Sequence, residues 1–285
     1  CYFRTRREPA MPHTVTRFTP WPILLLTCLT MTAFAANSLL TRLAFQTTSI
    51  DPASFSALRI ISGAATLWLI ATTSRQRIKT STTGLLSALL LFTYVAAFSF
   101  AYRHLNTGTG ALILFASAQL TMISYGMARG ERTSILGLAM ALGGLVLFLS
   151  PSATSPPLGA TLLMALAGLA WGVYSLLGKQ GSSPVAGTAL SFLWAIPLTC
   201  LLLLLQPHNL KLDSTGIVYA LLSGSLASGV GYALWYWVRV RMTTITASTV
   251  QLSVPVLSAL LGALLLNETI TLKATLSALI LLTGI

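Results

Sequence analysis

Arg59 is the residue of this sequence whose chemistry is hardest to explain by packing alone. It lies about seven residues, or roughly 10 Å, inside a run of apolar and small residues. A guanidinium in the middle of a bilayer costs about 2.5 kcal/mol or more, so it needs protein, water or a bound group around it. We expect either an anion contact or a gating ion pair, or else snorkelling or bonds to loop carbonyls. Asp51 is a partner only if the turn between the two residues brings it back.

Amides and aromatic side chains lie in the middle of other apolar runs. Asn37 and Tyr174 need hydrogen-bond partners there, which a cavity or a neighbouring helix can supply. Trp171 precedes Tyr174 by three residues, so both project to one side of a helix, as an aromatic wall or as ordinary packing. The candidate lining of a solute cavity is Asn37, Arg59, Trp171, Tyr174, Tyr232, Tyr236 and Gln251.

Pro255 lies inside a further apolar run. A proline removes one helical hydrogen bond and allows a kink there. The kink either serves gating or has no function, since prolines are frequent in transmembrane helices.

The acids and histidines fall in tails, loops and at the ends of runs. They are Glu8, Asp51, Glu131, Asp213, Glu268, His13, His104 and His208. An intramembrane proton relay, hydrolase or metal enzyme needs such groups near the middle of the membrane. We therefore expect no enzyme activity and no proton carrier. For Glu131 and Glu268, which lie next to Arg132 and Lys273, we expect loop-capping ion pairs, and the alternative is a transport site.

The cysteines give no support to metal or cofactor chemistry. Cys1, Cys28 and Cys200 show no metal-ligand spacing, and two of them lie inside apolar runs. We expect small buried packing residues, and the sequence predicts no metal and no cofactor.

The composition indicates an all-α integral membrane protein. Of 285 residues, 55% are apolar and only 8% are charged, against about 25% charged in globular domains. Mean hydropathy is +0.81. The apolar runs predict ten transmembrane helices, at Trp21–Phe45, Phe55–Thr72, Gly84–Tyr102, Gly108–Ala128, Ser134–Ser150, Leu158–Leu177, Val185–Leu205, Gly216–Val238, Ile245–Leu266 and Leu272–Ile285.

The basic residues indicate topology, not nucleic-acid binding, because they sit singly between the runs despite a net charge of +12. With the N-terminus inside, twelve Lys and Arg fall on the inner side against four outside, which predicts that both termini are cytoplasmic at an inner membrane. A basic tail before Ala33-Phe34-Ala35 also fits a signal peptide. Met11 is an alternative start, and the last run is too short to be complete.

Two landmarks recur at an offset of 137 residues. Asn37 to Arg42 falls on Tyr174 to Lys179, and Glu131 falls on Glu268. The repeat unit is then five spans long, so the second half enters the membrane inverted, a hallmark of secondary transporters. Chance similarity between apolar helices is the alternative. The predicted domains are a basic tail over 1–20, a first repeat over 21–150 and a second repeat over 158–285.

From Trp21 to Ile285 the chain resembles the drug/metabolite transporter superfamily, in its EamA-type branch of paired five-helix repeats. The resemblance rests on Asp51-Pro52 followed by Arg59, on Gly130-Glu131 and Asn267-Glu268, on Ala170-Trp171-Gly172-Val173-Tyr174, and on Pro255-Val256. The chain departs from the pattern at Ala118, where a proline is common, and at Phe34-Ala35, where Trp-Gly is common.

The resemblance implies ten helices around a central cavity and an exporter or facilitator of small organic metabolites, such as amino acids or drugs, that works by alternating access. We expect the cavity between the first, sixth, eighth and ninth predicted spans. The expected partners are the lipid bilayer and a small-molecule solute, and the oligomeric state stays open. The alternative is a membrane sensor or assembly protein that does not transport.

Overall fold

The computed structural model describes residues 20–76, 84–130, 134–149, 156–177, 184–207, 209–239, 241–242 and 250–284. Within these ranges all regular structure is helical and there is no strand. Seven helical segments are long and apolar enough to cross a membrane. The prediction of an all-α membrane protein is therefore confirmed, while the number of ten crossings stays a prediction.

The helices follow the predicted apolar runs closely. They are α1 (Pro20–Thr47), α2 (Pro52–Thr73), α3 (Gly84–Tyr102), α4 (Thr107–Ala128), α5 (Ile135–Leu149), α6 (Leu158–Leu177), α7 (Pro184–Leu204), α8 (Ser214–Leu222), the π-helix η2 (Ser223–Val230), α9 (Gly231–Arg239), α11 (Ser253–Leu266) and α12 (Leu272–Gly284). The segments α8, η2 and α9 follow one another without a break, so they occupy the place of one predicted span.

The start of α2 differs from the prediction because a polar cap sets it. The apolar run predicts a start at Phe55, but the helix begins at Pro52. The Asp51 carboxylate accepts hydrogen bonds from the backbone N–H groups of Ala53 and Ser54, both at 2.9 Å. Proline at the first helical position lacks an N–H that would have had no helical partner, so it fits there.

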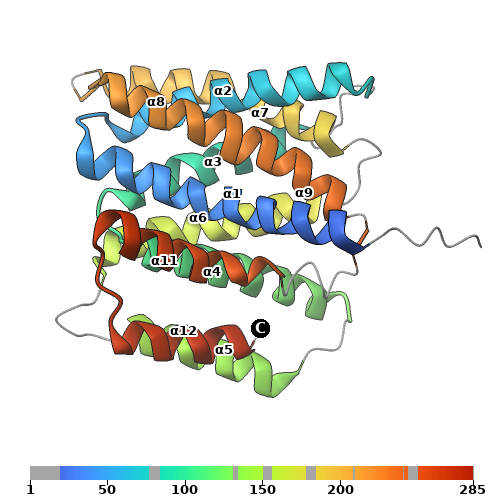
Figure 1. Ribbon diagram of the computed structural model, residues 1–285, viewed down its shortest axis with the longest axis vertical. Helices are drawn as coiled ribbons and strands as arrows, with labels where there is room; N and C mark the ends of the chain where they lie inside the picture. The colour runs from blue at the N-terminus through green and yellow to red at the C-terminus, as the bar shows by residue number, and fades with distance from the viewer. Residues whose placement is uncertain are drawn as a thin grey trace, which may run out of the picture.

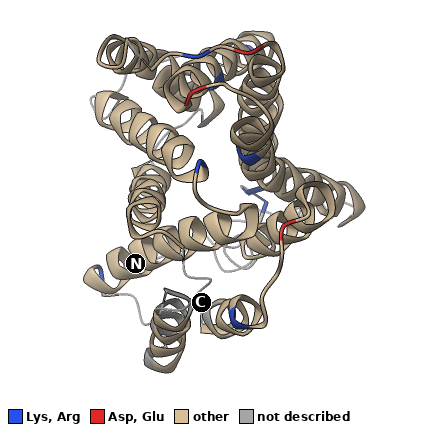
Figure 2. Cartoon of the chain, turned by 90° about the vertical axis from the view of Figure 1, so that its left-hand side faces the viewer, with Lys and Arg blue, Asp and Glu red and all other residues tan. Residues whose placement is uncertain are grey.

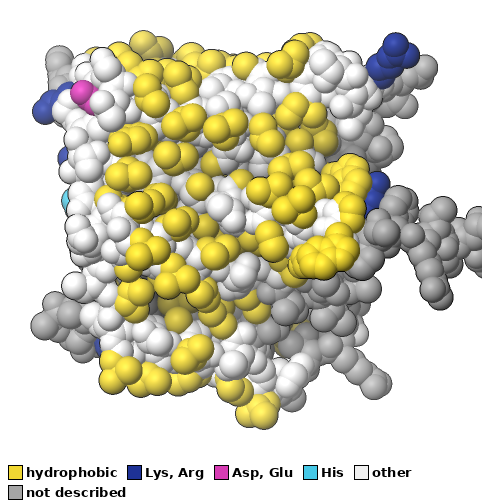
Figure 3. Space-filling model, viewed as in Figure 1, with side chains coloured by type: hydrophobic (Ala, Val, Ile, Leu, Met, Phe, Trp, Pro, Cys, Tyr) yellow, Lys and Arg dark blue, Asp and Glu magenta, His cyan; other side chains and the backbone are white. Residues whose placement is uncertain are grey.

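The helices lie side by side with their ends at two opposite faces. In Figure 1, α2, α7 and α8 lie along one edge, and α5 and α12 form a pair at the other edge. In Figure 2 the view is along the helices, and several of the coloured Lys, Arg, Asp and Glu positions lie on the connections between them. The face in Figure 3 is covered with apolar side chains between basic groups at its two sides. This distribution suits a bilayer between two polar surfaces.

Helices from the two halves of the sequence pack against each other in the core. Helix α2 packs on α7, α3 packs on α6 and α7, and α4 packs on α6 and α11. Close approach of α6 to α4 depends on two glycines four residues apart. A Cβ added to Gly172 would lie 2.9 Å from the Ala118 carbonyl oxygen, and one added to Gly168 would clash with the Leu114 carbonyl.

The cysteines lie on the outside of the bundle. Cys28 and Cys200 are free and exposed, which corrects the expectation that they are buried. Cys1 lies outside the described residues. In a bilayer an exposed cysteine on α1 or α7 contacts lipid, which accepts an apolar thiol as readily as a protein core does.

Candidate functional site

Arg59 lies at the centre of the described bundle with its side chain fully buried. Its Nη2 donates to the Tyr94 hydroxyl at 2.9 Å, and its Nε donates to the Ser228 hydroxyl at 3.3 Å. The guanidinium carbon lies 4.9 Å from the centre of the Phe98 ring and 5.3 Å from that of Tyr94. Its Nη1 has no hydrogen-bond partner among the residues that the structure describes. Full burial rules out snorkelling, and the two bonds go to side-chain hydroxyls, not to loop carbonyls.

A chain of hydrogen bonds joins Arg59 to Asn37 through Tyr94. The Asn37 amide nitrogen donates to the Tyr94 hydroxyl at 3.4 Å, and the Asn37 amide oxygen accepts from the Ser223 hydroxyl at 2.6 Å. A hydroxyl has two acceptor positions and one proton. Because the Tyr94 oxygen already accepts from Arg59 and Asn37, that side chain has only its own proton left to donate.

The π-helix η2 supplies both serines of this network. Ser223 and Ser228 are five residues apart in a segment of small residues, and both are fully buried. A Cβ added to Gly224 would clash with the Arg59 carbonyl and with Ser62, so only glycine lets η2 come this close to α2. Short π-helical segments often occur at functional sites. Here the segment places two hydroxyls opposite Asn37 and Arg59.

An aromatic wall stands beside the polar network. Trp171 stacks on Tyr232 with ring centres 5.3 Å apart and contacts Tyr94 at 5.1 Å and Tyr174 at 5.7 Å. The wall encloses a cavity of about 20 Å³, which is enough for one water. Its lining residues are Phe34, Asn37, Ser38, Tyr94, Phe98, Leu114, Phe115, Trp171 and Tyr232.

The structure therefore brings five of the seven candidate residues into one cluster: Asn37, Arg59, Trp171, Tyr174 and Tyr232. Tyr174 donates to Thr188 at 3.4 Å, and Tyr236 lies beside the Tyr174 hydroxyl. Gln251 is half-buried ahead of α11 and does not line the cavity. Helices α3 and α4 line the cavity, whereas the prediction placed the ninth span there.

Pro255 lies at the third position of α11 and is buried. The two helical residues before Leu252 are separated from α11 by a turn at that residue. Proline removes the hydrogen bond to the residue four places earlier, here Gln251. The helix is thus interrupted at Leu252, three residues before Pro255, and a kink at Pro255 itself stays a prediction.

A second polar cluster ties the helix ends together. The Glu268 carboxylate forms an ion pair with Arg42 Nε at 3.3 Å and accepts a hydrogen bond from the Thr107 backbone N–H at 2.7 Å. Arg42 was not among the expected partners of Glu268, because the two residues are 226 positions apart in the sequence and meet only where the helix ends come together in the fold. Glu131, the expected counterpart in the first half, lies outside the described residues.

Asp51 also forms hydrogen bonds that hold the fold together, and it does not pair with Arg59. Besides capping α2, its carboxylate accepts from the Lys211 backbone N–H at 2.8 Å, and its own N–H donates to the Lys211 carbonyl. The conditional pairing of Asp51 with Arg59 is therefore wrong. Among the residues that the structure describes, no carboxylate forms an ion pair with Arg59.

Sequence reasoning missed Tyr94, Phe98, Ser223 and Ser228. Each lies inside a predicted span and looked like an ordinary member of it. One signal was available, since a buried arginine needs hydrogen-bond acceptors and hydroxyl side chains occur in the middle of those spans. Nothing in one sequence tells which hydroxyl reaches the arginine.

Comparison with known proteins agrees with this architecture. Residues 158–285 match the model of the EamA-like transporter family. An uncharacterized protein of Pseudomonas aeruginosa is 52% identical over 86% of both chains. The chain belongs to the EamA-like transporter family. It is a multi-pass membrane protein of a transporter family, as its apolar helices and sequence resemblance predicted.

More distant relatives share most of the chain length. An uncharacterized transporter of Bacillus subtilis is 25% identical over 83% of this chain and 86% of its own length. A probable amino-acid metabolite efflux pump of Escherichia coli is 28% identical over 67% of this chain and 71% of its own length. One crystal structure has a TM-score of 0.66 at 17% identity, covering 92% of this chain and 95% of the other, which shows a shared fold.

Proposed function

We propose that this EamA-family protein is a secondary transporter of small organic solutes that carry a carboxylate, such as amino acids and related metabolites. Solute binds beside Arg59 in the cavity lined by Trp171, Tyr94 and Tyr232. The observation that carries the proposal is the buried, positively charged Arg59, which has hydroxyl partners and an unpartnered Nη1 but no carboxylate partner in the described chain.

The arrangement of charges favours an anionic group on the solute. Burying an ion without a counter-ion costs several kcal/mol, and a carboxylate offsets that cost with charge-assisted hydrogen bonds. The Tyr94 proton and the Asn37 amide lie next to the guanidinium and can hold other polar atoms of the same molecule. The stacked aromatic side chains suit its apolar part. The relative in Escherichia coli, a probable amino-acid metabolite efflux pump, agrees with this choice.

The size of the cavity supports a mechanism by alternating access. About 20 Å³ holds no organic solute, so helices must separate before one enters. Bonds between the two halves of the chain hold one end closed, from Arg42 to Glu268, from Thr107 to Glu268, and between Asp51 and Lys211. Opening that end breaks these bonds. We therefore assign the structure to a state closed at this end.

The helix contacts support two inverted repeats over 21–150 and 158–285. If the two halves are exchanged, α3 corresponds to the continuous segment α8–η2–α9, which we call the rod, and α6 corresponds to α1. Helix α3 packs on α6, and the rod packs on α1. In the same way, the packing of α4 on α6 corresponds to the packing of α11 on α1. The packing of α3 on α7 corresponds to the packing of the rod on α2. Such matching contacts are what a two-fold axis between five-helix halves requires, and a central site at their junction follows.

We further propose ten crossings of the bacterial inner membrane with both termini in the cytoplasm. The twelve-to-four division of basic residues favours this orientation. Single cysteines at Gln76 and Asn209, in a background without native cysteines, test it with an impermeant thiol reagent in intact cells. We expect labelling at Asn209 and none at Gln76. Labelling of Gln76 from outside contradicts the proposed topology.

Flux measurements test the function itself. Resistance of overexpressing and deletion strains to amino acids and their analogues selects candidate solutes. Purified protein in liposomes should then move a radiolabelled candidate, and empty liposomes should not. Protein with Arg59→Met should move it far more slowly at low solute concentration. Folded wild-type protein that moves none of the solutes selected in cells favours the second candidate, a membrane sensor or assembly protein without transport.

A further inference from the structure

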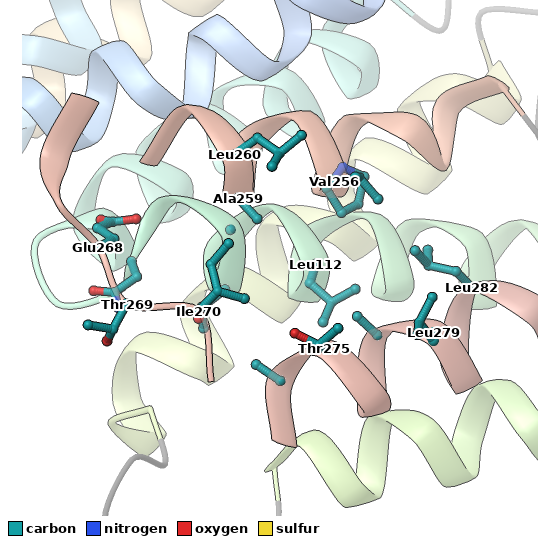
Figure 4. Close-up of a pocket in the computed structure, with 16 residues that line it drawn as sticks. Leu112, Val256, Ala259, Leu260, Glu268, Thr269, Ile270, Thr275, Leu279 and Leu282 are labelled. Atoms are coloured by element: carbon teal, nitrogen blue, oxygen red, sulfur yellow. The ribbon is translucent and has the colours of Figure 1, made fainter. Parts of the chain in front are cut away.

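A long apolar groove separates α12 from α4 and α11. Its volume is about 310 Å³. In Figure 4, Leu112 of α4 and Val256 of α11 lie across the groove from Thr275 and Leu279 of α12, and Glu268 and Thr269 lie at one end. Helix α12 packs mainly on α5, and this pair has few contacts with α4. The groove is therefore a space between the main bundle and a pair of helices attached to it loosely.

The dimensions of the groove match one leaflet of a bilayer. Its lining along α12 runs from Ala274 to Leu282, and its end beyond that helix is formed by Glu268 to Ile270. Nine residues of helix span about 13.5 Å, which is close to half of the hydrocarbon thickness of roughly 30 Å. The wall residues Val256, Leu260 and Leu279 keep 49, 49 and 56% of their surface exposed, so the groove is open to the surrounding membrane.

A polar pocket continues the groove at its end. The volume of this pocket is about 260 Å³, and it shares Asn106, Thr109, Thr269 and Ala274 with the groove. Its other lining residues are Pro156, Thr271 and Lys273. Lys273 brings a positive charge, and the threonines and Asn106 bring hydrogen-bond donors. The nearby Glu268 carboxylate adds little negative charge there, because Arg42 and the Thr107 N–H already hold it.

We propose that the groove and the polar pocket together bind one phospholipid with an anionic headgroup. The acyl chain lies along α12 between Leu112 and Leu279, and the headgroup phosphate lies among Lys273 and the threonine hydroxyls. An apolar space as deep as one leaflet, joined to a basic polar pocket at the membrane surface, fits an amphiphile with its charge at that surface. The bound lipid fills the space between α12 and α4, so it holds the α5–α12 pair against the bundle.

Lipid retention by purified protein tests this site without any transport measurement. We expect native mass spectrometry of wild-type protein to show one phosphatidylglycerol per chain, and retention from mixed liposomes to favour phosphatidylglycerol over phosphatidylcholine. Thr275→Phe fills the groove and should lower lipid occupancy at least tenfold. Leu276→Phe, a neighbour on α12 that is 48% exposed and outside the groove, is the matched control and should retain lipid.

The headgroup is tested separately. Lys273→Gln should reduce the preference for phosphatidylglycerol at least threefold, and Lys211→Gln, an exposed lysine outside the pocket, should not. Ala278→Leu gives a milder filling of the groove if Thr275→Phe fails to fold. Wild-type lipid occupancy in both filled variants overturns the proposal. Displacement of the lipid by inorganic phosphate alone also overturns it, because the pocket would then be a phosphate site that needs no acyl chain.

Discussion

Two arginines of this chain, Arg59 in the core and Arg42 in the second half of α1, have partners of different chemical kinds. Arg42 forms an ion pair with Glu268 and donates to the carbonyls of Tyr102 and Arg103, and part of its side chain stays exposed. Arg59 is fully buried, and within the described part of the chain it is bonded only to the hydroxyls of Tyr94 and Ser228. The more deeply buried charge is thus the one without a neutralising partner.

The difference separates a structural charge from a functional one. An ion pair satisfied within the protein ties α1, α4 and the α11–α12 connection together and leaves nothing for a ligand. A buried cation held by neutral dipoles costs stability, and retaining it makes physical sense where a bound anion completes the site. Substitutions at the two arginines should therefore act on different quantities, solute affinity at Arg59 and stability at Arg42.

The largest expected effect is loss of solute binding in Arg59→Met. Hydrogen bonds to a charged group are worth about 1.5–3 kcal/mol, so we expect the affinity for a carboxylate solute to fall roughly 10- to 150-fold. The melting temperature should stay the same or rise, since an apolar side chain of similar size removes an uncompensated buried charge. Flux in liposomes and thermal unfolding in detergent measure the two effects.

Arg129→Met is the control for this comparison. Arg129 also stacks on an aromatic side chain, with its guanidinium carbon 5.1 Å from the centre of the Tyr125 ring, but it is exposed at the end of α4. It should leave solute affinity within twofold of wild type. A folded Arg59→Met protein with wild-type affinity for carboxylate solutes would show that the two arginines do not differ in the proposed way.

The next largest effect is a loss of stability in Glu268→Gln. Removing the carboxylate leaves Arg42 without its partner and weakens the bond to the Thr107 N–H, for a cost of about 1–3 kcal/mol. Folding yield and melting temperature should fall, and the pH dependence of transport should stay that of the wild type, because no mid-membrane carboxylate carries a proton in the proposed mechanism. Loss of pH-dependent transport in well-folded Glu268→Gln would make Glu268 part of that mechanism.

The contrast between the arginines was only half visible in the sequence. The position of Arg59 in an apolar run predicts a buried charge, and the apolar runs predict the helices. The partner of each arginine depends on long-range packing, since Arg42 meets Glu268 across most of the chain and Ser228 reaches Arg59 through a π-helix. The sequence predicted Asn37 and Trp171 as members of one site because the repeat matches Asn37 with Tyr174 and helical spacing places Trp171 beside Tyr174. Both patterns can be read from one sequence, whereas the pairing of hydroxyls cannot.

A smaller effect is expected from Trp171→Ala, which removes the stacked wall and leaves Arg59 in place. Each aromatic pair adds about 0.5–1.5 kcal/mol, so we expect solute affinity to fall about 3- to 10-fold with membrane insertion unchanged. Trp194→Ala is the control, because Trp194 is 52% exposed on the outside of α7. An equal loss of solute affinity in both variants would mean that general packing causes the effect and that the aromatic wall does not contact the solute.

The smallest effect belongs to Tyr174→Phe, which deletes one hydroxyl at the edge of the wall. That hydroxyl donates to Thr188 at 3.4 Å, a long bond near the lower limit of about 0.5 kcal/mol for a neutral pair. We therefore expect less than a threefold change in solute affinity, measured by the same flux assay, because the ring keeps its tilted contact with Trp171. A tenfold or larger loss would mean that the hydroxyl touches the solute, and the site would then extend from Arg59 past the wall toward Tyr236. If Tyr174→Phe and Trp171→Ala both leave flux unchanged at normal protein levels, solute binds elsewhere, and the buried charge of Arg59 must be explained by folding alone.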